Sequence, residues 1–220
     1  KKWEAEQVAR VDPSEGGWKA VKPEGLKSSG GQELKVQPDG SVLASGPRNP
    51  AQDNYTAVIK AGGKITGLRL EALTHESLAN KSLARGNGNF VLTNLIVTAG
   101  GKPVKIAAAA ADYEQPGYPV AHLIDADPKT GWAGNGHVEA KSRTAVLTFA
   151  EPVDLGAAGE LKVELHHQSA YNQHHLGRFR LSVTEAAKPE VRPGADLPLD
   201  LTEAIAVAPE QRTPAQRDAL

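Results

Sequence analysis

The amino-acid sequence predicts an all-β fold, an antiparallel jelly-roll β-sandwich followed by a short C-terminal helical tail. First, short runs of residues alternate between apolar and polar side chains, which is the period of a strand with one buried face. Second, 22 glycines and 15 prolines supply turns between these runs. Third, about eight such runs with irregular connections are typical of two packed sheets.

The charge and the composition exclude several classes of protein. Lysine and arginine number 25 against 26 for aspartate and glutamate, giving a net charge of -1. No nucleic-acid partner is expected, because such proteins usually carry a clear basic excess. No apolar run approaches the roughly 20 residues of a membrane-spanning helix, so membrane insertion is not expected either. Without cysteine the chain forms no disulfide and no thiolate metal site.

The expected strands follow one another from residue 34 onward. In the run 65–73 the side chains at 68, 70 and 72 are apolar, and Arg69 and Glu71 lie on the opposite face. Pro38-Asp39-Gly40 predicts a hairpin turn, because glycine readily adopts a positive φ. The alanine run 107–111 is expected to be a buried strand whose small side chains allow close packing. The remaining strands are expected at 34–36, 41–45, 55–59, 90–97, 145–149, 161–165 and 179–183, with a helical turn at 120–124.

The chain is expected to have three parts. Residues 1–33 show little periodicity and predict an irregular N-terminal segment that packs on the sandwich, which itself spans 34–185. Residues 186–220 read as a proline-rich linker and the start of a following helical domain, with helical spacing at 201–208. Thr213 to Gln216 places threonine at the N-cap, proline at N1 and glutamine at N3 of a second helix.

One stretch of the chain resembles a known family. The residues Ala110 to Trp132 contain an alanine-rich strand and then the loop I-D-A-D-P-K-T-G-W. This arrangement is similar to that of discoidin-like, galactose-binding-like domains, although Ala126 stands where the family usually has glycine. The resemblance implies a β-sandwich in which the first aspartate ties the loop together through backbone hydrogen bonds. It also implies that Trp132 packs in the core.

A second resemblance covers residues 34–220. It rests on the strings DGSVLASG, ITGLRLEAL, GNGNFVLTNLIV, LIDADPKTGW, HHLGRFRLSVT and APEQRTPAQRDAL. These resemble the central region of large planctomycete-type secreted proteins that join c-type cytochrome domains to other domains. The resemblance implies an extracytoplasmic module, periplasmic or secreted, that contacts polysaccharide and the neighbouring domains of the same chain.

The loop that carries the first resemblance also suggests a cation site. Asp125, Asp127 and Thr130 could supply oxygen ligands to a structural Ca²⁺, since this ion prefers oxygen ligands. The spacing is not that of an EF-hand, which needs glycine at position 6 and glutamate at position 12. The alternative is a loop closed by its own hydrogen bonds, and the sequence favours that alternative.

Histidine and arginine are concentrated late in the chain. His166, His167, His174 and His175 are expected in a solvated connecting loop, with a zinc or copper site as the alternative. Arg178 and Arg180 alternate with apolar residues, which predicts that they lie on a hydrated sheet face.

The function expected from these features is that of a non-catalytic carbohydrate-binding module. Sugar recognition needs an apolar platform for C–H faces and planar polar groups for hydroxyls. Two alternatives stay open: a structural spacer that docks neighbouring domains without a ligand, and a polysaccharide-active enzyme domain, although the chain contains no G-x-S-x-G elbow. The candidate sugar-binding residues lie in loops expected at one end of the sandwich: Tyr118, His137, Tyr171, Tyr113, Asn135 and Arg85.

Overall fold

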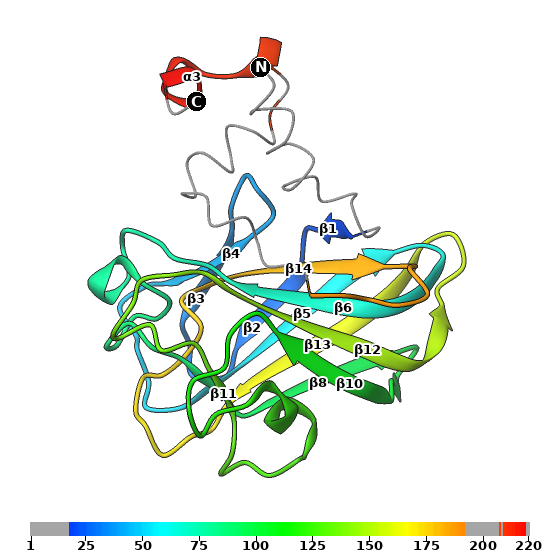
Figure 1. Ribbon diagram of the computed structural model, residues 1–220, viewed down its shortest axis with the longest axis horizontal. Helices are drawn as coiled ribbons and strands as arrows, with labels where there is room; N and C mark the ends of the chain where they lie inside the picture. Colours follow the sequence, from blue (N-terminus) through cyan, green and yellow to red (C-terminus); the bar gives the residue numbers. More distant parts are fainter. Residues whose placement is uncertain (1–17, 192–206, 208, 219–220) are drawn as a thin grey trace.

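Two antiparallel sheets pack face to face (Figure 1) in the computed structural model, which describes residues 18–191, 207 and 209–218. This architecture confirms the expected all-β sandwich. The short helix α3 (Pro214–Asp218) lies near the C-terminal end, also as expected. Residues 192–198 of the linker expected at 186–198 lie outside the described residues, as do all residues of the helix expected at 201–208 except Val207.

The first sheet has seven strands. Their order is β10-β12-β6-β14-β4-β3, and β1 also pairs with β14, beyond the short stretch where β14 meets β4. The strands are β1 (Lys19–Val21), β3 (Glu33–Val36), β4 (Val42–Ser45), β6 (Lys64–Ala72), β10 (Ile106–Ala111), β12 (Arg143–Asp154) and β14 (Arg178–Thr184).

The second sheet has five strands in the order β2-β5-β13-β8-β9, and a small third sheet pairs β7 with β11. The strands of the second sheet are β2 (Glu24–Ser28), β5 (Asp53–Ala61), β8 (Asn94–Ala99), β9 (Lys102–Pro103) and β13 (Gly159–His167). Those of the third sheet are β7 (Val91–Leu92) and β11 (Trp132–Ala133). Short 3-10 helices are η1 (Ala79–Lys81), η2 (Val120–Ile124) and η3 (Pro209–Gln211). The turn expected at 120–124 is therefore confirmed.

The hydrophobic core lies between the two large sheets. Alternate residues of each strand point inward, so Leu68 and Leu70 of β6 are fully buried while Arg69 and Glu71 face the other way. Trp132 is also fully buried, and its ring packs edge-on against Phe90 with ring centroids 5.0 Å apart. Its indole N–H donates a 2.9 Å hydrogen bond to the carbonyl of Tyr113. The tryptophan is thus a core residue, as the resemblance implies.

Two expectations about strands differ from the structure. Residues 19–28 contain β1 and β2, so the described part of the expected irregular segment takes part in both sheets. These strands are short, mostly exposed and, in β2, interrupted by a register shift, so they carry no alternating pattern. The alanine run does form β10, but this strand lies at a sheet edge and Ala107, Ala108 and Ala110 are exposed rather than buried.

The expected hydrated face of Arg178 and Arg180 is instead a network of ion pairs. Arg178 is 6% exposed and donates hydrogen bonds to Asp39 (2.7 Å) and Ser41 (2.9 Å). Arg180 forms a bidentate ion pair with Glu71, with N···O distances of 2.8 and 2.9 Å. The sequence does not reveal this network, because Asp39 lies in a turn 139 positions from Arg178 along the chain.

The N-cap of α3 forms as the sequence predicts. The backbone N–H of Gln216 donates to the Thr213 hydroxyl, and the backbone N–H of Thr213 donates to the Gln216 side chain, which is the reciprocal capping arrangement. No helix among the described residues is long and apolar enough to cross a membrane.

Candidate functional site

An exposed group of aromatic side chains lies at one end of the sandwich, where β5 begins and β10 and β13 end. We call Tyr118, Tyr171 and His174 the aromatic cluster. The hydroxyl groups of Tyr118 and Tyr171 are 3.1 Å apart, and their rings meet at 64° with centroids 6.4 Å apart. The ring of His174 lies 5.4 Å from that of Tyr171. Tyr171 is 53% exposed, so its ring is open to a ligand.

The loop that carries Tyr118 is held by short-range hydrogen bonds. The backbone N–H of Tyr118 donates to the carbonyl of Gln115 (2.8 Å), and Gly117 between them has a φ of +85°, which glycine adopts without strain. The side chain of Gln115 accepts a 2.9 Å bond from Asn89. The carboxylate of Glu114 accepts a bond from the backbone N–H of Val120. The position of Tyr118 is therefore set by the backbone and not by core packing.

The loop that carries Tyr171 and His174 joins β13 to β14 and is tied to the segment before β5. Gln173 donates from its backbone to the carbonyl of Ala51 (2.8 Å) and from its side chain to the carbonyl of Asn49 (2.9 Å). Gln52 donates from the opposite side to the carbonyls of Gln168 and Ser169, each at 3.1 Å. These bonds fix both arms of the loop and leave the tyrosine ring outside.

A buried polar network lies beneath this loop, centred on the carboxylate of Asp53. Asp53 is fully buried and accepts bonds from the hydroxyls of Ser28 (2.5 Å) and Ser29 (3.0 Å), the backbone N–H of Gly30 (2.7 Å) and the Gln32 amide (3.0 Å). Burial alone would raise the pKa of Asp53, but these hydrogen bonds outweigh it and lower the pKa below its ordinary value. The carboxylate is therefore charged at neutral pH.

Gln32 and two histidines extend the network to the loop. The amide nitrogen of Gln32 lies 2.8 Å from the Tyr55 hydroxyl and 3.2 Å from Nδ1 of His175. Nε2 of His167 accepts a 3.3 Å bond from the backbone N–H of Leu176, so a neutral imidazole closes the loop between these residues. Burial lowers the pKa of His167 to about 3, and burial also lowers the pKa of His175. The four late histidines were expected to be solvated, but His167 and His175 are buried.

Arg85, a candidate sugar-binding residue, instead holds the chain together. Its guanidinium donates to the carbonyls of Ser45 (3.1 Å), Gly46 (2.6 Å) and Arg48 (2.6 Å) and to the Gln32 side chain (2.8 Å). With these acceptors already bound, the guanidinium has little capacity left for a ligand. The expectation that Arg85 binds sugar from an open loop is therefore not supported, because backbone carbonyls distant in the sequence surround its guanidinium.

Within the described part of the chain, no hydrogen bond or ring contact joins the remaining candidate sugar residues to the aromatic cluster. The ring of Tyr113 is half-buried under the guanidinium of Arg143, 4.0 Å from its centroid. Asn135 has a φ of +60°, and its backbone carbonyl accepts the N–H groups of Val138 and Glu139. His137 is exposed in that same turn. A role of these three residues in binding stays a prediction of the sequence.

The loop with Asp125, Asp127 and Thr130 closes through its own hydrogen bonds. One oxygen of Asp125 accepts the backbone N–H of Asp127 (2.9 Å), and the other accepts the Thr130 hydroxyl (2.8 Å). Asp127 accepts the backbone N–H of Lys129. These bonds match the backbone-tying role that the resemblance implies for the first aspartate. Calcium binding here stays a prediction, and within the described ranges no group of three or more potential ligands is positioned around a metal.

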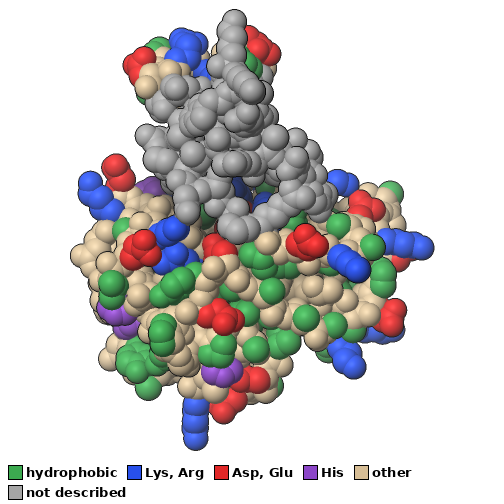
Figure 2. All heavy atoms as spheres, viewed as in Figure 1, with side chains coloured by type: hydrophobic (Ala, Val, Ile, Leu, Met, Phe, Trp, Pro, Cys, Tyr) green, Lys and Arg blue, Asp and Glu red, His purple; other side chains and the backbone are tan. Residues whose placement is uncertain are grey.

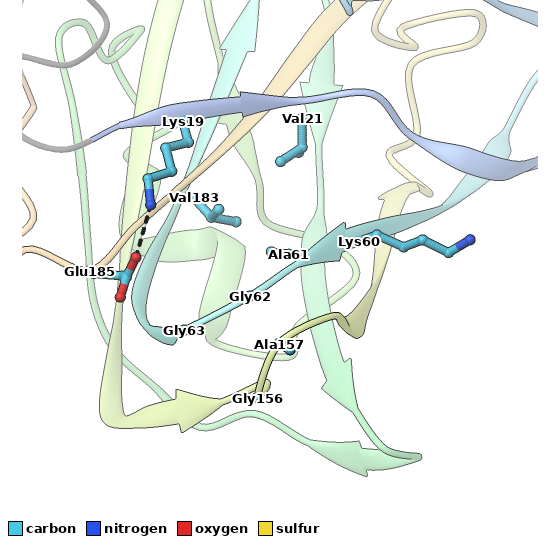
Figure 3. Close-up of a pocket in the computed structure, with 10 residues that line it drawn as sticks. All are labelled: Lys19, Val21, Lys60, Ala61, Gly62, Gly63, Gly156, Ala157, Val183 and Glu185. Atoms are coloured by element: carbon cyan, nitrogen blue, oxygen red, sulfur yellow. Dashed lines mark hydrogen bonds and ion pairs between the residues drawn. The ribbon is translucent and has the colours of Figure 1, made fainter.

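Two hollows are lined by residues outside the aromatic cluster. One, of about 370 Å³, lies on the outer face of the five-stranded sheet, where His166 and Glu164 approach to 3.4 Å beside Lys27. The other, of about 440 Å³, lies at the opposite end of the sandwich, beside the β5–β6 turn (Figure 3). There, Lys19 and Glu185 pair with each other at 2.9 Å, and small side chains such as Ala61 and Ala157 line the rest. Neither hollow is lined by a tyrosine, tryptophan or phenylalanine side chain.

No protein-family model matches this chain, and neither a curated protein nor a solved structure matches it. The function of the chain is therefore inferred from its own residues. Sequence reasoning singled out Tyr118 and Tyr171, but it missed Asn172 and the part played by His174. The one signal available for both was their position beside Tyr171 in a loop rich in amides and histidines.

The loop 125–132 yields a prediction about stability. Ala126 has a φ of +62°, in the left-handed region that costs a non-glycine residue about 1–2 kcal/mol. The change Ala126→Gly removes this strain and adds some entropy to the unfolded chain, so we expect the free energy of unfolding to rise by about 0.5–1 kcal/mol. Urea denaturation measures this change. Ala140→Gly is the control, since Ala140 is an exposed loop residue whose φ is not positive; it should not stabilise.

The buried histidines predict how stability depends on pH. His167 binds its proton only below about pH 3 in the folded chain but near pH 6.5 when unfolded, so between these values the unfolded state binds more protons. The contribution of neutral His167 to the free energy of unfolding should therefore be fully present above about pH 6.5. Below that pH it should fall by up to about 1.4 kcal/mol per pH unit. His167→Gln keeps an acceptor for the N–H of Leu176 and cannot titrate there. We expect a shallower decline for this variant in urea titrations from pH 7.5 to 4.5, and equal slopes would contradict the argument.

Proposed function

We propose that this chain is a non-catalytic carbohydrate-binding module that anchors a larger exported protein to polysaccharide. The observation that carries the proposal is the contact between Tyr118 and Tyr171. Two loops far apart in the sequence bring these rings together at one end of the sandwich, and the ring of Tyr171 stays 53% exposed. An exposed aromatic pair held by backbone hydrogen bonds is typical of a binding surface, because core packing does not account for it.

The physical properties of the aromatic cluster suit a sugar. An aromatic ring offers a flat apolar face to the C–H groups of a pyranose, and hydroxyl and amide groups beside it bond the sugar hydroxyls. Within the described part of the chain, the exposed side chain of Asn172 makes no hydrogen bond, so its amide is free for a ligand. Because both loops are held in place, little conformational entropy remains to be lost on binding.

The angle between the rings divides their roles. At 64° the two rings cannot both lie flat against one sugar. Tyr171, the more exposed, supplies the platform, while Tyr118 forms a side wall and holds the Tyr171 hydroxyl through the 3.1 Å contact. Binding should therefore depend more on the ring of Tyr171 than on the ring of Tyr118.

A second candidate function, a docking spacer, is favoured by the chain that follows β14. The hydroxyl of Thr66 donates to the carbonyl of Ala186 (2.6 Å), and the ring of Pro189 lies so close to Gly67 that a Cβ there would come within 2.9 Å of it. The start of the C-terminal segment thus packs on the outer face of β6. This contact is compatible with binding at the far end, so one module can both dock and bind.

The proposal predicts the behaviour of two substitutions at one position. Tyr171→Ala removes the platform and should weaken retention on a bound polysaccharide by about tenfold to a hundredfold, or about 1.4–2.8 kcal/mol. Tyr171→Phe keeps the ring and should lose less than about fivefold. Affinity electrophoresis through gels containing a panel of polysaccharides measures both.

The melting temperature provides the control for folding. Both variants should melt close to the unchanged protein, because the side chain of Tyr171 is exposed and has few core contacts. Equal retention of Tyr171→Ala and the unchanged protein would rule out this surface. Failure of the unchanged protein to bind any polysaccharide would favour the docking spacer.

A further inference from the structure

We infer that the aromatic cluster takes an uncharged polysaccharide and discriminates against sulfated and uronic-acid chains. The inference rests on the carbohydrate-binding function proposed above and names the class of ligand for the same site. It follows from how few charges the two loops carry and from what Arg85 and Arg143 nearby already bind.

The two loops that form the cluster are almost free of charged residues. Among residues 114–119 and 168–175, the only lysine, arginine, aspartate or glutamate is Glu114. Its carboxylate accepts a bond from the backbone N–H of Val120 and so serves the loop itself. The polar groups left to meet a ligand are the tyrosine hydroxyls, the side chain of His174 and the amide of Asn172, which are groups that can hydrogen-bond the hydroxyls of a sugar.

The immediate surroundings of Tyr118 carry no charge either. Its pKa is raised by the hydrogen bond with Tyr171, by partial burial and by the coulombic effect of Tyr171, and no lysine, arginine, aspartate or glutamate is among the causes. Among the described residues, no ion pair involves a member of either loop. A sulfate or carboxylate placed on the cluster would therefore lose water without gaining a partner of opposite charge.

Two of the arginines at this end of the sandwich, Arg85 and Arg143, already have partners; Arg48 is exposed beside Gly31. Arg85 is surrounded by three backbone carbonyls and the Gln32 side chain. Arg143 donates to the carbonyl of Gly134 (3.0 Å), pairs with Glu139 (2.9 Å) and lies over Tyr113. Recognition of sulfate or carboxylate normally uses a free guanidinium or ammonium group. Neither Arg85 nor Arg143 can turn to the ligand without breaking bonds that hold the loops.

Elsewhere on the sandwich, charges of both signs are present. Figure 2 shows Lys/Arg and Asp/Glu side chains interspersed over one face of the molecule, without a large area of one sign. The hollow on the five-stranded sheet contains Lys27, Glu164 and His166. An acidic polysaccharide would find its cations there and not at the cluster, so Lys27 provides a control position.

The test compares polysaccharides that share one backbone and differ only in charge. Suitable pairs are dextran with dextran sulfate, and methyl-esterified with de-esterified polygalacturonan, in affinity electrophoresis at low and high NaCl. We expect retention by neutral members only, with little dependence on salt because no counterions are released. Tyr171→Ala should lower this retention at least tenfold, whereas Lys27→Ala should leave it unchanged.

A gain-of-charge variant makes the test stronger. Asn172→Lys adds a cation beside the platform, and we expect it to add salt-sensitive retention by the charged members of each pair. Asn172→Gln keeps the amide and should not. If Asn172→Lys, like Asn172→Gln, does not bind a charged member, the lack of charge beside the platform does not set the selectivity, and the inference fails.

The outcomes separate the inference from the proposed function. Tighter, salt-sensitive binding of the charged members that is lost in Tyr171→Ala would overturn the inference and leave the carbohydrate-binding function standing. Binding that is lost in Lys27→Ala but kept in Tyr171→Ala would move the site to the hollow and overturn both. Absence of binding to any neutral or charged polysaccharide, including cellulose and xylan, would overturn the proposed function itself.

Discussion

The buried carboxylate of Asp53 is the interaction on which the functional end of this sandwich depends. A charge in an interior is tolerated only when it is paired or fully hydrogen-bonded. Here donors from residues 28–32 satisfy it, and this draws the segment between β2 and β3 onto the start of β5. The side chain of Gln32, which is bonded to Asp53, also forms hydrogen bonds with His175 and Arg85. The loop with Tyr171 therefore packs on a buried network whose carboxylate is fully hydrogen-bonded.

The two sheets form the hydrophobic core, and the loops carry the exposed aromatic side chains. The sheets bury a continuous apolar core, including Trp132, and so fix where each strand ends. The loops use buried neutral imidazoles and amides to hold their shape, which leaves the exposed aromatic rings free for a ligand. Rigid loops on a sandwich scaffold lower the entropy lost on binding, and this favours recognition of a shallow ligand such as a polysaccharide chain.

What the sequence could predict depends on how far apart the interacting residues are. The buried face of β6 and the cap of α3 follow from spacings of two or three residues, so local pattern was sufficient. Tyr118 could be placed on a loop because glycine and proline flank it. The bonds from Gln32 to Asp53 and His175 span 21 and 143 residues, and no local pattern reveals them. Arg85 was misjudged for the same reason, since its carbonyl partners lie about 40 positions away.

The most direct test of this account is amide hydrogen exchange in Asp53→Asn, compared with Asp154→Asn, a control that changes an exposed carboxylate in the turn before Gly156. The account predicts faster exchange at the N–H groups of Gly30, Gln173 and Leu176 in Asp53→Asn, with the strands of the core unchanged. In Asp154→Asn these three groups should exchange as in the unchanged protein. Unaltered protection at Gln173 and Leu176 in Asp53→Asn would contradict the claim that this carboxylate holds the loop of Tyr171.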